Sequence, residues 1–238
     1  MKILLLSDIH ANFPALKACI DYFSKVSFDA IYNCGDSLVY GPFPKQTLKW
    51  LQKNGVQSIV GNTDKKVIKI LKGKTFKKPR MEEKRVMYTW TARQLGSKAK
   101  KYLLSLGKSL QFPIADHRIG LFHGSPAHPN EFLFPDTQEE RFEELAASCA
   151  CDIIITGHSH TPYHKQVGST HFINPGSIGR MFDSNPDASC AILTINTKTI
   201  KVDHYRIPWP IQRTIKALQK HNLPEIYQAM YLAGRKLN

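Results

Sequence analysis

Three short apolar runs alternate with two helical patterns over the first 62 residues, and this alternation restricts the fold more than any other feature. The apolar runs lie at residues 2–10, 29–36 and 56–62, and each ends in polar residues. The stretches 11–26 and 42–55 between them carry apolar residues at helical spacing. Parallel strands need such crossovers, so the order predicts an α/β fold whose strands end at a common edge. Open α/β sheets place their binding sites at that edge.

The second half of the chain is expected to be rich in short strands. Apolar runs at 118–125, 151–160, 169–177 and 190–207 are separated by Gly, Pro and Asn turns. Two helices are predicted near 211–220 and 224–236. No repeat, low-complexity tract or linker interrupts the sequence, so we expect one domain covering residues 1–238.

The composition is typical of a soluble globular protein, with 42% apolar and 22% charged residues. No apolar run approaches the ~20 residues of a membrane-spanning helix. Residues 2–6 are too short for a secretory leader and are interpreted as a first strand. We therefore expect a cytoplasmic protein without membrane contact. Five cysteines without C-x-x-C spacing favour free, mostly buried thiols.

The positive charge is concentrated in residues 65–108, which we expect to be long and helical. This segment holds 15 Lys and Arg against 2 Glu, so it carries +13 of the net charge of +14. A localised positive field attracts anionic partners. Two interpretations of this segment remain open: a solvated helical surface, and a surface that binds nucleic acid. Its aromatic residues Tyr88, Trp90 and Tyr102 are more typical of helix packing than of base stacking.

Side chains that bind metals occur at five predicted strand ends. Each D-x-H or H-x-H pair is weak evidence for a metal site by itself, because such residues also serve as caps or as hydrogen-bonded histidines. Together they are more specific, since neighbouring strands would bring them to one edge. The seven residues are Asp8, His10, Asp36, Asn62, His123, His158 and His160.

Two carboxylates, one amide oxygen and four imidazoles suit borderline divalent ions such as Mn, Fe, Ni, Co or Zn. No thiolate is present to enforce zinc. Seven side chains exceed what one ion takes, so we predict two divalent metal ions that share a bridging carboxylate.

The order of these motifs resembles that of the calcineurin-like metallophosphoesterases. The matching motifs are D-x-H, G-D, G-N, a single H and G-H-x-H, and the stretches SDIHAN, GDSLVYGPFP, HGSPAHP, INPGSIG and LPEIYQAMYLAGR resemble the small single-domain bacterial and archaeal branch. The resemblance implies a four-layer α/β/β/α sandwich. It also implies that Asp36 bridges the ions, that Asp8, His10 and His160 bind one, and that Asn62, His123 and His158 bind the other.

The expected function is hydrolysis of a nucleotide or another small phosphodiester through a metal-bridging hydroxide. Many relatives carry a His after the Gly-Asn pair, where it protonates the leaving oxygen, but here that position is Thr63. An aliphatic hydroxyl is a very poor acid near neutral pH. Family members without this His are associated with phosphodiesterase activity, so we predict that diesters react faster than monoesters.

Three residues are candidates for contact with the substrate: Asn12, Thr63 and His128. Asn12 is equally suited to capping its loop, and His128 is a candidate for the missing acid. The branch often carries a Pro-Arg pair after NPGSIG, but here the sequence reads Arg180-Met181-Phe182, which argues against a substrate role for Arg180. The other histidines are interpreted as surface or packing residues: His117, His164, His171, His204 and His221.

Two rival functions remain open. The first is a non-catalytic scaffold with this fold, which the seven intact ligands argue against. The second is a nuclease or RNA-binding factor that uses residues 65–108, for which binding would depend strongly on salt. The sequence is also compatible with a homo-oligomer.

Overall fold

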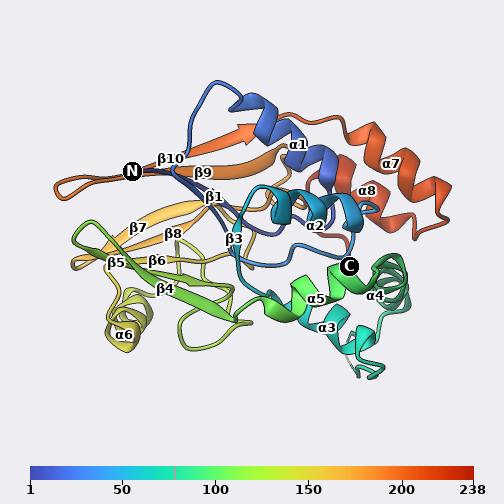
Figure 1. Cartoon of the computed structure of the whole chain (residues 1–238), viewed down its shortest axis with the longest axis horizontal. Helices are drawn as coiled ribbons and strands as arrows, with labels where there is room; N and C mark the ends of the chain where they lie inside the picture. Colours follow the sequence, from blue (N-terminus) through green and yellow to red (C-terminus); the bar gives the residue numbers. More distant parts are fainter. Residues whose placement is uncertain (78) are drawn as a thin grey trace.

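Two five-stranded sheets lie face to face in the computed structural model of the chain, which describes residues 1–77 and 79–238 (Figure 1). The first sheet contains β1 (Lys2–Leu6), β2 (Ala30–Asn33), β3 (Gln57–Ser58), β9 (Ala188–Ile195) and β10 (Ile200–Ile207). The second contains β4 (Ser109–Ile114), β5 (His117–Phe122), β6 (Ile153–Ile155), β7 (Tyr163–Val167) and β8 (Thr170–Asn174). Their strand orders are β10-β9-β1-β2-β3 and β4-β5-β6-β8-β7. As predicted, β1, β2 and β3 are parallel, and the antiparallel strands β9 and β10 extend their sheet.

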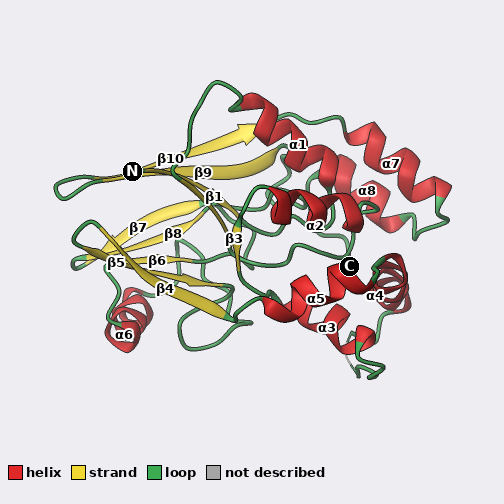
Figure 2. Ribbon diagram, viewed as in Figure 1, coloured by secondary structure: helices red, strands yellow, loops and turns green. Residues whose placement is uncertain are grey.

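Helices cover the outer faces of both sheets (Figure 2). They are α1 (Phe13–Tyr22), α2 (Pro44–Lys53), α3 (Asn62–Leu71), α4 (Glu82–Gln94), α5 (Ser97–Ser105), α6 (Glu139–Cys149), α7 (Ile211–Lys220) and α8 (Ile226–Ala233). Helix α1 packs on β9 and β10, whereas α6 packs against β7 of the second sheet. Helices α4 and α5 contact α2 and also α3, so α3, α4 and α5 form one group beside the first sheet.

The alternation of side chains along β1 shows how the layers form. Ile3 and Leu5 point into a core between the two sheets. Leu4 and Leu6 point to the opposite face and join a core with the helices. A third core packs Phe142 of α6 against the outer face of the second sheet. Three cores separate four layers, so the predicted α/β/β/α sandwich is confirmed.

The basic segment is largely helical, as expected, but it does not form one long helix: residues 82–105 are divided between α4 and α5. The break lies at Leu95 and Gly96, whose backbones are extended. Tyr88 is buried, and Trp90 and Tyr102 pack against the same core as partly buried residues. These aromatic side chains therefore contribute to packing.

Three elements had no counterpart in the sequence prediction: β4, α6 and β7. Strand β4 lies at a sheet edge, where a proline such as Pro113 is tolerated because it cannot donate to a ladder. Helix α6 buries only Phe142 and Leu145 on an otherwise polar surface, which weakens its helical signal. None of the described helices combines the length and apolar character that crossing a bilayer requires. Within the described residues, all five cysteines are free, as expected.

Candidate metal centre

The seven predicted ligands come together where strand ends of both sheets meet. Asp8 and His10 follow β1, Asp36 follows β2, and Asn62 begins α3 four residues after the end of β3. The remaining ligands come from the second sheet, with His123 after β5, and with His158 and His160 after β6. The site therefore lies between the sheets, and neither sheet alone could build it.

Six of these residues form two groups, each with ligand atoms within 4.8 Å of one another: Asp8, His10 and His160 in the first, and Asp36, His123 and His158 in the second. In the first group, Asp8 Oδ1 lies 3.3 Å from His160 Nε2 and 3.9 Å from His10 Nε2. In the second, Asp36 Oδ1 lies 3.4 Å from His123 Nε2.

Asn62 lies in the second group. The inward end of its amide is 2.9 Å from His123 Nε2, 3.0 Å from His158 Nδ1 and 3.2 Å from Asp36 Oδ2. With the amide oxygen inward, it meets a carboxylate oxygen and imidazole nitrogens that are themselves acceptors in the neutral form. A cation between these atoms satisfies all of them at once.

The donor atoms that face the centre are those a divalent ion requires. Asp8 Oδ1 is buried and has no hydrogen-bond partner among the described residues. Backbone carbonyls accept from Nδ1 of His10 at 3.2 Å (Leu38 O) and of His123 at 2.8 Å (Cys34 O). These contacts leave Nε2 of both rings free to bind a metal. The residues present fit two divalent ions.

The protonation states support the same conclusion. Burial raises the pKa of Asp8, but the nearby charges of His160 and His123 outweigh burial and lower the pKa to about 2. The pKa of Asp36 is also held well below its usual range, because the charge of His123 outweighs burial. Burial lowers the pKa of His10 to about 3 and that of His158 to about 4. Ionised carboxylates and neutral imidazoles are the forms that bind metals.

His123 differs from these imidazoles. Burial lowers its pKa, but the adjacent Asp36 carboxylate outweighs burial and raises the pKa to about 9. The imidazolium thus balances the Asp36 charge when no cation does. Metal binding at this position is therefore expected to release a proton.

Backbone strain is concentrated at the ligands. Five ligand residues have φ in the left-handed region: Asp8 (50°), His10 (50°), Asp36 (52°), His158 (65°) and His160 (57°). Non-glycine residues in such sparsely populated regions cost on the order of 1–3 kcal/mol each. Gly61 permits close approach of the loops, because a Cβ there would collide with the Asp36 carboxylate. Strain of this density is typical of a functional site rather than of a structural turn.

A family model of the calcineurin-like phosphoesterase superfamily domain matches residues 1–198. The chain belongs to this superfamily. The likeness predicted from the motifs is thereby confirmed, and with it the phosphoesterase class of hydrolase. The family is metal-dependent, which agrees with the two ligand groups of this phosphoesterase.

Individual relatives agree with this assignment. An uncharacterized protein of Methanocaldococcus jannaschii is 27% identical over 250 residues, covering 98% of both chains. Phosphodiesterase YfcE of Escherichia coli is 24% identical over 196 residues, covering 78% of this chain and 84% of YfcE. The crystal structure of a metallophosphoesterase from Sphaerobacter thermophilus superimposes with a TM-score of 0.80 at 26% identity, covering 98% of this chain and 99% of that one.

An open pocket of about 210 Å³ lies over the ligand groups. Two aromatic side chains at the pocket stack on ligand imidazoles: Phe132 on His158, with ring centroids 4.2 Å apart, and Phe182 on His160, at 4.3 Å. The pocket gives a substrate direct access to the predicted metal ligands. Its walls also include residues that sequence analysis did not identify as site residues: Tyr40, Lys84, Phe132, Arg180, Phe182, Lys236 and Asn238.

Thr63 lines this pocket. Its hydroxyl donates to Leu38 O at 3.1 Å, and its backbone N–H donates to Asp36 Oδ1 at 2.8 Å. Asp64, next in the chain, accepts from the backbone N–H groups of Ser37, Leu38 and Gly61. Asp64 thus joins the two ligand loops, and burial followed by the charge of Asp36 raises its pKa to about 7.

The other two substrate candidates require correction. Asn12 is fully buried; its Nδ2 donates to Gly179 O at 3.2 Å, and its Oδ1 accepts from Thr214 Oγ1 at 3.0 Å. Oδ1 also caps α1 by accepting from Ala15 N, so the capping role replaces the expected phosphate contact. His128 is exposed and outside the pocket lining, and its Nδ1 accepts from Asn130 N. A hydrogen bond from Ser125 N to His128 O at 3.0 Å closes a turn at residues 125–128.

Proposed function

We propose that this phosphoesterase is a dinuclear metal-dependent phosphodiesterase that hydrolyses a nucleotide or another small phosphodiester. The proposal is carried by two adjacent ligand groups beneath one open pocket. Two divalent ions held there would neutralise phosphate charge and acidify water for attack on phosphorus. Mn²⁺ is the first ion to test, because the ligands are nitrogen and oxygen donors without a thiolate.

Asp36 is the residue proposed to bridge the ions. Its carboxylate belongs to the second ligand group, while its backbone oxygen accepts from the His10 N–H of the first group at 2.9 Å. The Thr63 N–H and the loop held by Asp64 fix its orientation. The chain therefore presents Asp36 rigidly at the junction of the two groups.

The preference for diesters follows from the side chains around the pocket. Among its lining residues in the described chain, His10, His158 and His160 are all predicted ligands, which leaves no spare imidazole to protonate a leaving group. The Thr63 hydroxyl already donates to a backbone carbonyl. Alkyl monoesters, which need a proton on the departing oxygen, should react slowly. The name of the E. coli relative, a phosphodiesterase, supports the same preference.

The test is metal analysis of the purified protein, followed by hydrolysis of bis(4-nitrophenyl) phosphate and 4-nitrophenyl phosphate with Mn²⁺, Ni²⁺ or Fe²⁺. We expect about two ions per chain and a larger kcat/KM for the diester. Absence of diesterase activity with every ion would instead support a non-catalytic scaffold.

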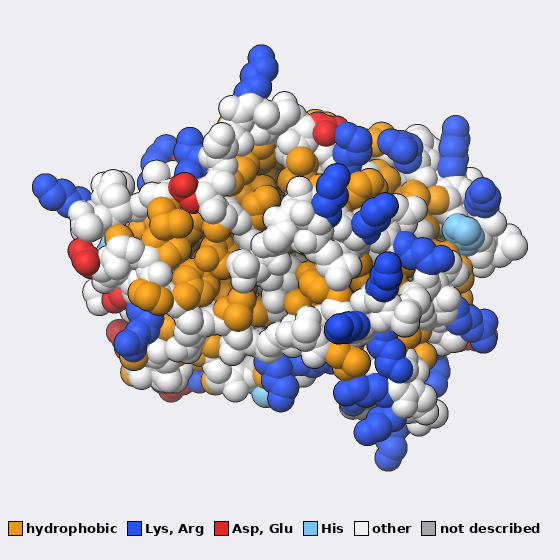
Figure 3. Space-filling model, viewed as in Figure 1, with side chains coloured by type: hydrophobic (Ala, Val, Ile, Leu, Met, Phe, Trp, Pro, Cys, Tyr) orange, Lys and Arg blue, Asp and Glu red, His pale blue; other side chains and the backbone are white. Residues whose placement is uncertain are grey.

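A second candidate function is nuclease activity on RNA. Lys and Arg side chains gather over α3 and α4, in the lower right of Figure 3, where few acidic side chains are visible. Such a surface would hold a polyanion next to the pocket through phosphate contacts. Cleavage of short RNA with a steep dependence on salt would favour this function over hydrolysis of a small diester.

A further inference from the structure

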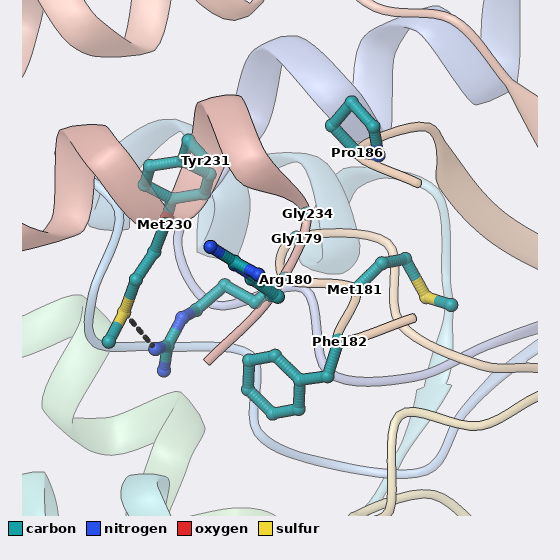
Figure 4. Close-up of a pocket in the computed structure, with 9 residues that line it drawn as sticks. Gly179, Arg180, Met181, Phe182, Pro186, Met230, Tyr231 and Gly234 are labelled. Atoms are coloured by element: carbon teal, nitrogen blue, oxygen red, sulfur yellow. Dashed lines mark hydrogen bonds between the residues drawn. The ribbon is translucent and has the colours of Figure 1, made fainter. Parts of the chain in front are cut away.

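Arg180 is a charged residue outside the ligand set, and it lies in the wall of the pocket over the metal ligands. Arg180 is only 8% exposed, and among the described residues no carboxylate lies within ion-pair distance of its guanidinium. The guanidinium carbon is 4.0 Å from the Tyr40 ring centre. One guanidinium nitrogen is 3.1 Å from Met230 Sδ; Figure 4 shows this contact in a second, smaller pocket that Arg180 also lines. The rings of Phe182 and Tyr227 lie farther away, at 5.3 and 5.5 Å, and aromatic rings with a thioether stabilise a buried cation only in part. The guanidinium therefore retains unused donors beside the pocket.

The backbone fixes this side chain next to the metal centre. Arg180 N donates to Ser177 Oγ at 2.8 Å, and Arg180 O accepts from His160 Nδ1. The Tyr40 ring also contacts His10, with ring centroids 5.2 Å apart. Arg180 is thus adjacent to the first ligand group without being a ligand, although its shifted position in the sequence argued against such a role.

The same pocket contains further positive charge. Lys84 of α4 and Lys236 line it together with Arg180. Among the described residues, the one acidic side chain in its lining is that of Asp36, which already faces the metal ligands. This wall of the pocket therefore carries positive charge that the metal ligands do not neutralise.

We propose that Arg180 and Lys84 form a second phosphate-binding subsite, so that the substrate is a phosphodiester carrying an additional phosphate group. The inference rests on the proposed phosphodiesterase function and names its substrate class. The scissile phosphate would lie at the predicted metal ligands. The Arg180 guanidinium is therefore available to bind the additional phosphate group. Guanidinium binds phosphate through two parallel hydrogen bonds, and the lysine adds a flexible point charge.

A matched pair of substrates tests the subsite: thymidine 5′-(4-nitrophenyl phosphate) and the same compound with a 3′-phosphate. We expect the 3′-phosphate to lower KM at least about tenfold, as a charge-assisted hydrogen bond does. Arg180→Met, which keeps the packing volume, should abolish this preference, and Lys84→Met should reduce it. Arg93→Met, an exposed position on the same helix as Lys84, is the control and should retain it. The ratio of the KM values for the two substrates cancels any loss that a substitution causes for both of them.

A binding measurement separates the subsite from turnover. Calorimetry compares thymidine 3′,5′-bisphosphate with thymidine 5′-monophosphate, and the bisphosphate should bind at least about tenfold more tightly in an Arg180-dependent manner. Equal affinities, or an equal loss for both compounds in Arg180→Met, would overturn the subsite. Tighter bisphosphate binding without hydrolysis of either ester would retain the subsite and refute the phosphodiesterase function. If Arg180→Met does not fold, Lys84→Met decides the question.

Discussion

The backbone N–H of Thr63 donates a 2.8 Å hydrogen bond to Asp36 Oδ1. The residue that stands in place of the expected catalytic His therefore orients the carboxylate proposed to bridge two ions. Since this contact uses the backbone, any residue except proline can make it. The side chain at position 63 can thus change without loss of the carboxylate's support.

Replacing Thr63 by His should restore a leaving-group acid. General acid catalysis contributes on the order of 10²–10⁴-fold, and a newly placed imidazole should recover at least about tenfold in kcat/KM for an alkyl monoester. Thr63→Val, which keeps the shape and the N–H, is the control and should leave the diester rate within a few-fold. The interpretation fails if the unaltered protein hydrolyses monoesters as fast as diesters.

Asp36→Ala should abolish turnover and reduce the bound metal from about two ions to one per chain. The substitution removes the proposed bridge and leaves the His123 imidazole without its counter-charge. Metal analysis and diester kinetics measure both effects. Asp21→Ala, an exposed position paired with Lys17, is the control and should retain both ions. An active Asp36→Ala protein that holds two ions would refute the bridging role.

Removing metal should lower stability as well as activity. Asp8 and Asp36 are buried near each other, and a cation that binds only the folded state stabilises it by about 2.7 kcal/mol at 100 times its Kd. Thermal unfolding in EDTA should therefore show a lower Tm, which Mn²⁺ in excess restores. An unchanged Tm on chelation, in protein shown to contain metal beforehand, contradicts this prediction.

Glu131→Gln should destabilise the fold near neutral pH but not in acid. A hydrogen bond from the Arg141 guanidinium lowers the pKa of Glu131, against a smaller effect of burial. A lowered carboxyl pKa contributes stability above the ordinary value of 4.5, and this contribution is lost as pH falls through the folded-state pKa. Because both side chains are partly exposed, we expect about 0.5–1 kcal/mol in urea unfolding at pH 7. Glu143→Gln, exposed on α6, is the control; an equal loss at all pH values would exclude the ion pair as the cause.

Local patterns were sufficient to predict an α/β fold and the candidate ligands, whereas the four-layer sandwich was implied by the family resemblance. Alternating apolar residues form strands such as β1, and polar residues directly after a strand must lie at its end, whatever the rest of the chain does. The identity of Asp8, Asp36 and Asn62 as candidate ligands follows from that position and from their oxygen donors. The helix at 211–220 was likewise predicted with its correct bounds, because its apolar spacing is regular.

Only the tertiary structure decided how these residues combine. Asp8 meets His160 across 152 positions of sequence and across two sheets, a contact that no local spacing specifies. The same packing buries Asn12 as a cap, leaves His128 exposed outside the pocket lining and places Arg180 in the pocket wall. The physical reason is that strand ends are set by local alternation, whereas the direction of a loop side chain depends on what packs against it from distant elements.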